Sequence, residues 1–135
     1  MAIVGFRITE LNAKNNEKAA SNIEVKSTPK ITDIEEIKLS NLENVLKILF
    51  DFETKYDPNV GNIKISGYAL YQSDDAKKIL DSWKKSKALS AKLAENFLNF
   101  ILRKCLIKIT YLADELNLPP AVRFPILKAK RSKEK

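Results

Sequence analysis

Residues 88 to 127 read ALSAKLAENFLNFILRKCLIKITYLADELNLPPAVRFPIL, and this stretch decides the fold class. From Ala88 to Leu116 the apolar residues recur with the spacing of one long helix. Two prolines in Asn117-Leu118-Pro119-Pro120 end that helix, because proline cannot continue it. The chain before residue 73 has strand-like patterns, so the order is strands first and helix last. This order is typical of a small α+β domain.

Four stretches ahead of the helices have the alternation or composition of strands. The clearest is Val45 to Tyr56, where Leu46, Ile48, Phe50 and Phe52 share one side and charged residues occupy the other. One apolar and one charged face indicate an antiparallel sheet with one side in water. The remaining strands are predicted at residues 3–11, at residues 63–72, and in a segment that opens with Ile23-Glu24-Val25.

Several features between these strands predict turns or irregularities. Asn12 to Asn22 is polar and unperiodic, which indicates a long connection. Pro29 either ends the second strand or places it at the sheet edge. Ile31, Ile34 and Ile37 recur every three residues, which fits an irregular strand or a helical turn equally well. Gly67 predicts a bulge or a close approach of another backbone.

A short helix is predicted directly after the fourth strand. Ser73 is a suitable N-cap, and two aspartates would follow it in the first turn, where negative charge is favourable. Ile79, Leu80 and Trp83 then form a small apolar face. A break is expected at Ser86-Lys87.

The long helix carries more apolar surface than one sheet can cover. From Phe97 to Leu112 it is apolar around most of its circumference, whereas a sheet face covers a stripe of about 100°. The surplus predicts a second partner, either another subunit or a bound chain. Burial under the C-terminal segment of the same chain is the alternative, and both remain open. The surplus residues are Phe100, Leu102, Leu106 and Ile107.

Composition sets further limits. The 135 residues suit one domain, predicted over residues 1–127, with a basic disordered tail at 128–135. We expect neither a secretory signal nor membrane insertion, since no apolar run is long enough. A single cysteine, Cys105, excludes an internal disulfide and favours a cytoplasmic location.

The residue types needed for common catalytic chemistry are scarce. Histidine is absent, which removes the commonest general base and zinc ligand. The sequence contains no phosphate-binding loop, CxxC pair or dinucleotide motif. We therefore predict a protein that is not an enzyme and that uses no cofactor and no metal.

The positive charge lies in the second half of the chain. Residues 1–72 carry a net charge of −1 and residues 73–135 a net charge of +8. Most such lysines are simply solvated, but the excess also fits an RNA- or ribosome-associated protein. In that alternative, Trp83 would stack on a base. The residues that bind the nucleic acid would be Lys77, Lys78, Lys84, Lys85 and Lys87.

The order and spacing of six segments are similar to one known family. They are Phe6-Arg7-Ile8-Thr9-Glu10-Leu11-Asn12-Ala13, Ile23-Glu24-Val25-Lys26, Val45-Leu46-Lys47-Ile48-Leu49-Phe50-Asp51-Phe52, Ile65-Ser66-Gly67-Tyr68-Ala69-Leu70-Tyr71, Arg103-Lys104-Cys105-Leu106-Ile107-Lys108 and Leu118-Pro119-Pro120-Ala121-Val122. In this arrangement the chain resembles the SecB-like chaperones, the family of the bacterial preprotein-export chaperone SecB. The resemblance covers the chain up to about Leu127.

The resemblance implies a four-stranded antiparallel sheet followed by one short and one long helix packed on one face. It also implies a homo-dimer or tetramer that holds unfolded polypeptides in apolar grooves without ATP. The export chaperone docks the SecA motor through an acidic sheet face, whereas the matching face here mixes Lys47, Asp51, Glu53, Lys55 and Lys64. A stand-alone holdase, or a chaperone dedicated to an antitoxin-like client, is therefore expected rather than delivery to an export motor.

The apolar positions of the helix, the third strand region and the C-terminal segment are the candidate client-binding residues. Residues of this kind are more often core or subunit-interface residues than groove residues, since periodic apolar positions usually pack inside. They are Leu42, Leu46, Ile48, Phe97, Phe100, Ile101, Val122 and Phe124.

Overall fold

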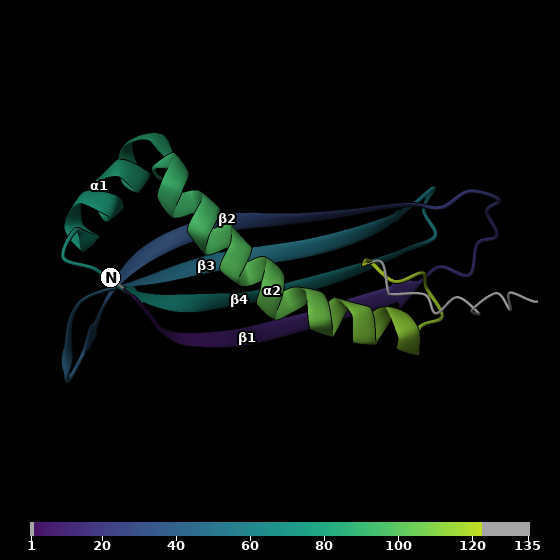
Figure 1. Cartoon of the computed structure of the whole chain (residues 1–135), viewed down its shortest axis with the longest axis horizontal. Coiled ribbons are helices and arrows are strands. Elements are labelled where there is room, and N and C mark those ends of the chain that lie inside the picture. Colours follow the sequence, from purple (N-terminus) through teal and green to yellow (C-terminus); the bar gives the residue numbers. More distant parts are fainter. Residues whose placement is uncertain (1, 123–135) are drawn as a thin grey trace, which may run out of the picture.

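The computed structural model describes residues 2 to 122. The predicted tail at 128–135 lies outside these residues. Four strands precede two helices, as the order of the sequence patterns predicts (Figure 1). The elements are β1 (Ala2–Asn15), β2 (Glu24–Leu39), β3 (Leu42–Asp57), β4 (Gly61–Gln72), α1 (Ala76–Ser86) and α2 (Ala91–Glu115).

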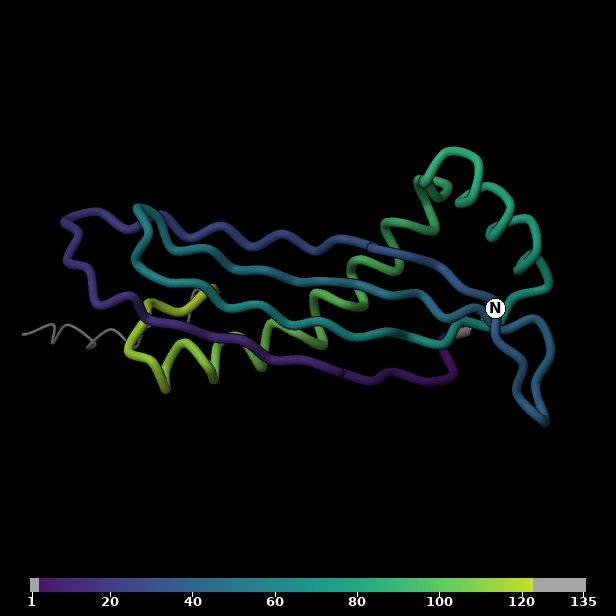
Figure 2. The backbone as a smooth tube through the Cα atoms, turned by 180° about the vertical axis from the view of Figure 1, so that it is seen from behind, coloured from purple at the N-terminus to yellow at the C-terminus, as the bar shows by residue number. Residues whose placement is uncertain are grey.

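The four strands form one antiparallel sheet in the order β1-β4-β3-β2. The connection from β1 to β2 passes around one end of the sheet, beyond the β3–β4 turn (Figure 2). The first strand is longer than predicted, because residues Asn12 to Asn15 continue its pairing with β4. These polar residues pair through their main chain, which their side chains do not reveal.

The spacing of the first two isoleucines in β2 results from a bulge, whereas Ile37 follows Ile34 without a register shift and lies on the other face of the strand. Ile31 lies opposite Phe50, and Ile34 lies opposite Ile48, with a register shift between Ile31 and Asp33. One extra residue at Thr32 keeps both isoleucines on the core side of the strand. The irregular strand is therefore the correct alternative. Pro29 lies within this strand, which is at the sheet edge and so tolerates a missing N–H.

The predicted alternation in β3 is confirmed. Leu46, Ile48, Phe50 and Phe52 are fully or almost fully buried. The core they build continues through the inward side of β4, where Ile63, Ile65, Ala69 and Tyr71 are also buried.

Gly67 in β4 marks a close approach of two backbones. A Cβ atom there would lie 2.2 Å from the carbonyl oxygen of Arg7 in β1. The register of β1 shifts nearby, between Ile8 and Glu10. Both expectations for this glycine are thus met at the same place.

The short helix α1 begins later than predicted. Its N-cap residue is Asp75, which makes no side-chain cap, and its first turn contains no acidic residue. Ser73 instead accepts a hydrogen bond from the main-chain nitrogen of Asp75 in the turn ahead of the helix (3.1 Å). The helix ends at Ser86 with Lys87 in a left-handed conformation, as the predicted break requires.

The long helix α2 crosses one face of the sheet diagonally (Figure 1). Ser90 caps its start, with its hydroxyl accepting a hydrogen bond from the nitrogen of Leu93. A stripe at four-residue spacing faces the sheet and is buried. It consists of Phe97, Ile101, Cys105, Ile109 and Ala113.

The chain after α2 is fixed to the end of the sheet. Leu118 is buried in the core, and the Tyr56 hydroxyl donates a hydrogen bond to the Pro119 carbonyl (2.7 Å). The Asn15 side-chain amide donates to the Leu116 carbonyl (2.7 Å). These contacts hold the segment after the helix beside the last turns of α2.

Candidate functional site

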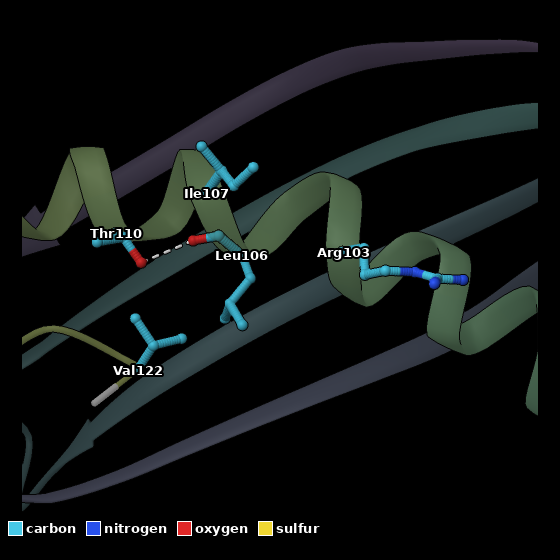
Figure 3. A pocket seen from close by; sticks show the side chains of 5 residues that line it. All are labelled: Arg103, Leu106, Ile107, Thr110 and Val122. Atoms are coloured by element: carbon cyan, nitrogen blue, oxygen red, sulfur yellow. Dashed lines mark hydrogen bonds between the residues drawn. The ribbon is translucent and has the colours of Figure 1, made fainter. Parts of the chain in front are cut away.

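An apolar groove lies between the outer side of α2 and the segment that follows this helix. Its volume is about 540 Å³, and its wall is almost entirely apolar. Leu106 and Val122 point toward each other, whereas Ile107 extends from the helix in a different direction (Figure 3). The lining residues are Arg103, Leu106, Ile107, Thr110 and Val122.

Two features give this groove its shape and its apolar character. The hydrogen bond from Tyr56 to Pro119 and the burial of Leu118 determine where Val122 lies. The Thr110 hydroxyl donates to the Leu106 carbonyl one turn earlier (2.8 Å; Figure 3), so it leaves its methyl group as the apolar part of the wall.

Two large apolar side chains of this helix are mostly exposed to water. Ile107 is 75% exposed and Tyr111 is 64% exposed. They are one turn apart and therefore lie on the same side of α2. Large apolar groups that gather on a surface mark interaction sites more often than isolated ones do.

A second hollow continues the groove toward the end of α2. It has a volume of about 290 Å³ and shares Thr110 with the first. The other lining residues are Tyr111, Asp114, Leu118 and Pro120. The combined groove thus has Arg103 near one end and Asp114 near the other. We call it the α2 groove.

Comparison with known proteins identifies the architecture. No protein-family model matches the sequence, and no curated protein matches it either. One similar solved structure is the Mycobacterium tuberculosis SecB-like chaperone Rv1957, in complex with a ChAD peptide from the antitoxin HigA1. The identity is 14%, the TM-score is 0.57, and the match covers 96% of this chain and 92% of the other.

This chain has a SecB-like fold. The likeness extends over almost the whole sequence, and it confirms the resemblance inferred from the six segments. It also confirms the predicted α+β class with two helices behind a four-stranded sheet. At this level of identity the comparison establishes the fold. The bound peptide is a property of the mycobacterial complex.

Four of the predicted client-binding residues are in the core of the SecB-like fold. Leu46, Ile48 and Ile101 have no exposed surface, and Phe97 is 2% exposed. They fill the layer between the sheet and α2, so they cannot contact a client in this conformation. We therefore assign these four side chains to packing rather than to a surface groove.

The other four predicted residues are dispersed. Val122 lines the α2 groove, whereas Leu42 lies far away, in a hollow at the β2–β3 hairpin. Phe100 is half-buried and packs edge-on against Phe6 of β1, with ring centroids 5.6 Å apart. Phe124 lies outside the described residues.

The sequence pattern missed most of the groove. Arg103, Thr110 and Tyr111 were not predicted as site residues, and Ile107 was recognised only as surplus apolar surface. A signal for them existed. Residues 103, 107 and 111 recur every four positions, offset from the buried stripe that contains Cys105 and Ile109.

The lysines proposed for nucleic acid all lie on or beside α1 and are all exposed: Lys77, Lys78, Lys84, Lys85 and Lys87. Trp83 does not join them as a stacking surface, because it is only 7% exposed. Its indole N–H donates to the Asp33 carboxylate (3.3 Å), which attaches α1 to β2. The basic surface therefore lacks the ring that was predicted to stack on a base.

The sheet face opposite the helices has charges that pair with one another. Lys64 lies 3.6 Å from the Asp51 carboxylate and Lys55 lies 3.9 Å from that of Glu53. The Lys47 ammonium lies 4.5 Å from the centre of the Tyr68 ring. This face carries both positive and negative side chains, as its sequence predicts, and they pair with one another.

Three further features concern metal ligands, membrane-spanning helices and the one cysteine. Within residues 2–122, no three potential metal ligands lie together, and neither helix is long and apolar enough to span a membrane. Cys105 faces the sheet, and burial raises its thiol pKa to about 11, against a smaller lowering effect of Lys108. Such a thiol is protonated and unreactive at neutral pH.

Proposed function

We propose that this chain is a polypeptide-binding chaperone that holds unfolded segments in the α2 groove without ATP. The observation that carries this proposal is the exposed apolar surface of α2 around Ile107 and Tyr111, beside a groove with an apolar wall. Removing apolar surface from water contributes about 25 cal/mol per Å². Burial of a client in this groove supplies the binding free energy, so holding needs no nucleotide.

An antitoxin-like segment is the client class that we propose. It is supported by a protein with the same fold, which was solved with a peptide from an antitoxin. The groove is open along one helix and contains few polar groups. Such a surface accepts short segments of variable sequence, because apolar contacts require little directional fit.

We further propose that the chain forms a homo-dimer through the free edge of β1. From Glu10 to Asn15 this edge strand pairs with β4 without a register shift, so its outer side presents a regular row of main-chain groups. The other edge strand, β2, contains Pro29, which blocks such pairing. Leu11 on the β1 edge is 52% exposed and would be covered by a second copy.

Charge supports an antiparallel pairing of two β1 strands centred on Asn12. In that register Glu10 lies opposite Lys14 of the second copy, and the two-fold axis creates the same pair twice. Two subunits would also offer two grooves to one client, which strengthens weak individual contacts.

The decisive experiment measures aggregation of a chemically unfolded substrate by light scattering, at an equimolar ratio of chain to substrate. Wild-type protein should slow aggregation, and added ATP should change nothing. Ile107→Asp should lose most of this effect, since it places a charge in the groove. Ile23→Asp is the matched control, because Ile23 is also exposed but lies outside the groove. Unchanged aggregation in the presence of wild-type protein would contradict the proposal.

A further inference from the structure

The charged side chains at the two ends of the α2 groove differ in sign. Arg103 lines one hollow and Asp114 the other, and Thr110 belongs to both. Arg103 extends along the helix, away from Val122 (Figure 3), so the middle of the groove stays apolar. The groove therefore has a positive end, an apolar centre and a negative end.

Both charges are available to a ligand. Arg103 and Asp114 are exposed, and among residues 2–122 neither takes part in an ion pair. The acids and lysines on the opposite face of the sheet, in contrast, already compensate one another. From residue 96 to residue 113, α2 carries three basic residues and no acidic one, which strengthens the positive end. They are Arg103, Lys104 and Lys108.

The separation of the two ends sets the spacing of a matching ligand. Arg103 and Asp114 are eleven positions apart in the helix, which is about 16 Å at about 1.5 Å per residue. An extended peptide advances about 3.3 Å per residue, so about five residues cover this distance. Opposite charges on a client would meet both ends when they are about five positions apart.

We propose that the α2 groove selects extended client segments in which an acidic and a basic residue, about five positions apart, flank an apolar stretch. The acidic residue lies at Arg103 and the basic residue at Asp114, while the apolar residues cover Leu106, Ile107 and Val122. The inference rests on the proposed function, because it names the client class of the same groove. It gives a weakly specific apolar surface a preferred sequence and a preferred orientation.

Four fluorescein-labelled peptides test this selection by fluorescence anisotropy. All share one central stretch of four apolar residues and differ only at the two flanking positions: Asp and Lys, Gln and Gln, Asp and Asp, or Lys and Lys. Wild-type protein should bind the Asp/Lys peptide most tightly, with about a two- to fivefold gain per matched end over Gln/Gln. This advantage should disappear in 1 M salt, where the Debye length is about 3 Å, while Gln/Gln binding persists.

Charge reversal on the protein should exchange the preferences. Arg103→Glu makes both ends of the groove negative, so the Lys/Lys peptide should become the tightest ligand. Asp114→Lys makes both ends positive and should favour Asp/Asp. Arg7→Glu is the control, since Arg7 is exposed on the opposite sheet face, across from Tyr68. It should leave the order of the four peptides unchanged.

The results that would overturn the charge selection differ from those that would overturn the proposed function. Equal binding of all four peptides by the wild type would overturn the charge selection and leave the apolar groove in place. Binding of no peptide would overturn the proposed function as well. If Ile107→Glu reduces the mass of the native particle in sedimentation, a second copy occupies the groove, and the inference is wrong.

Discussion

The Tyr56 hydroxyl donates a hydrogen bond to the Pro119 carbonyl oxygen at 2.7 Å, which joins the third strand to the segment after the last helix. Tyr56 itself is completely buried, and burial raises its pKa. Together with the burial of Leu118, this contact links the core to the α2 groove, because the segment it fixes continues to Val122.

Tyr56→Phe should therefore affect both stability and binding. We expect the free energy of unfolding in urea to fall by about 1 kcal/mol, since the partly buried Pro119 carbonyl loses its donor. Client peptides should also bind more weakly, because Val122 is held less firmly beside α2 when only Leu118 and the Asn15 hydrogen bond fix this segment. Tyr111→Phe is the control for stability, since Tyr111 is largely exposed. Equal urea midpoints for Tyr56→Phe and the wild type would show that the contact is unimportant.

The close approach at Gly67 predicts that a Gly-to-Ala change lowers stability more at position 67 than at position 5. Gly67→Ala would place Cβ against the main chain of Arg7 and Ile8, which cannot move without separating β1 from β4. We expect a loss of about 2–3 kcal/mol. In Gly5→Ala the nearest atom, at 3.0 Å, belongs to the flexible Leu70 side chain, so the loss should stay below about 1 kcal/mol. Thermal melts of the two variants compare them directly, and equal melting temperatures would contradict this account.

Two isoleucines of α2 should separate stability from binding. Ile101→Ala leaves a cavity in the core and should cost about 2–5 kcal/mol. Ile107→Ala should change stability by less than about 0.5 kcal/mol, because this side chain is mostly in water. It should nevertheless weaken client binding. A large loss of stability in Ile107→Ala would mean that its surface is covered within the native particle.

Cys105 predicts a loss of stability in alkaline solution. Its thiol pKa is raised to about 11 in the folded chain, above the ordinary value near 9. As the pH rises above 9, the unfolded chain therefore loses this proton first, which favours unfolding until the pH reaches about 11. The stability difference between wild type and Cys105→Ala should shrink over this range. A difference that is constant between pH 8 and pH 11 would show that the thiol is not buried as described.

The proposed β1 edge dimer can be tested by exchanging charges. Glu10→Lys places like charges opposite each other twice in the two-fold arrangement and should weaken the dimer at least about tenfold, as measured by sedimentation. The double variant Glu10→Lys with Lys14→Glu restores opposite charges and should restore the dimer. A monomeric wild-type chain, or a dimer indifferent to both changes, would exclude this edge.

The sequence pattern was sufficient for the class and order of elements because the strongest signals are local. The alternation in β3 and the four-residue spacing of Phe97, Ile101 and Cys105 both depend on the period of one element. The same local evidence could not distinguish core from groove. Ile101 was predicted as a client-binding residue and Ile107 as surplus apolar surface, and the position of the sheet shows that the first is buried and the second exposed.

Two other features could not be predicted from the sequence because they depend on tertiary contacts. The bulge at Thr32 is defined by the partner strand, so the isoleucine spacing of β2 remained ambiguous in the sequence. The groove wall at Val122 depends on a hydrogen bond between residues 56 and 119, which are distant in the chain. No window of sequence contains both.

A nuclear magnetic resonance titration of methyl-labelled protein with an unfolded apolar peptide tests the central claim most directly. If clients bind in the α2 groove, the methyl signals of Leu106, Ile107 and Val122 should shift together. Those of Leu49 and Leu70 on the opposite sheet face should stay in place. Shifts confined to the opposite face, or no shifts at saturating peptide, would contradict the account.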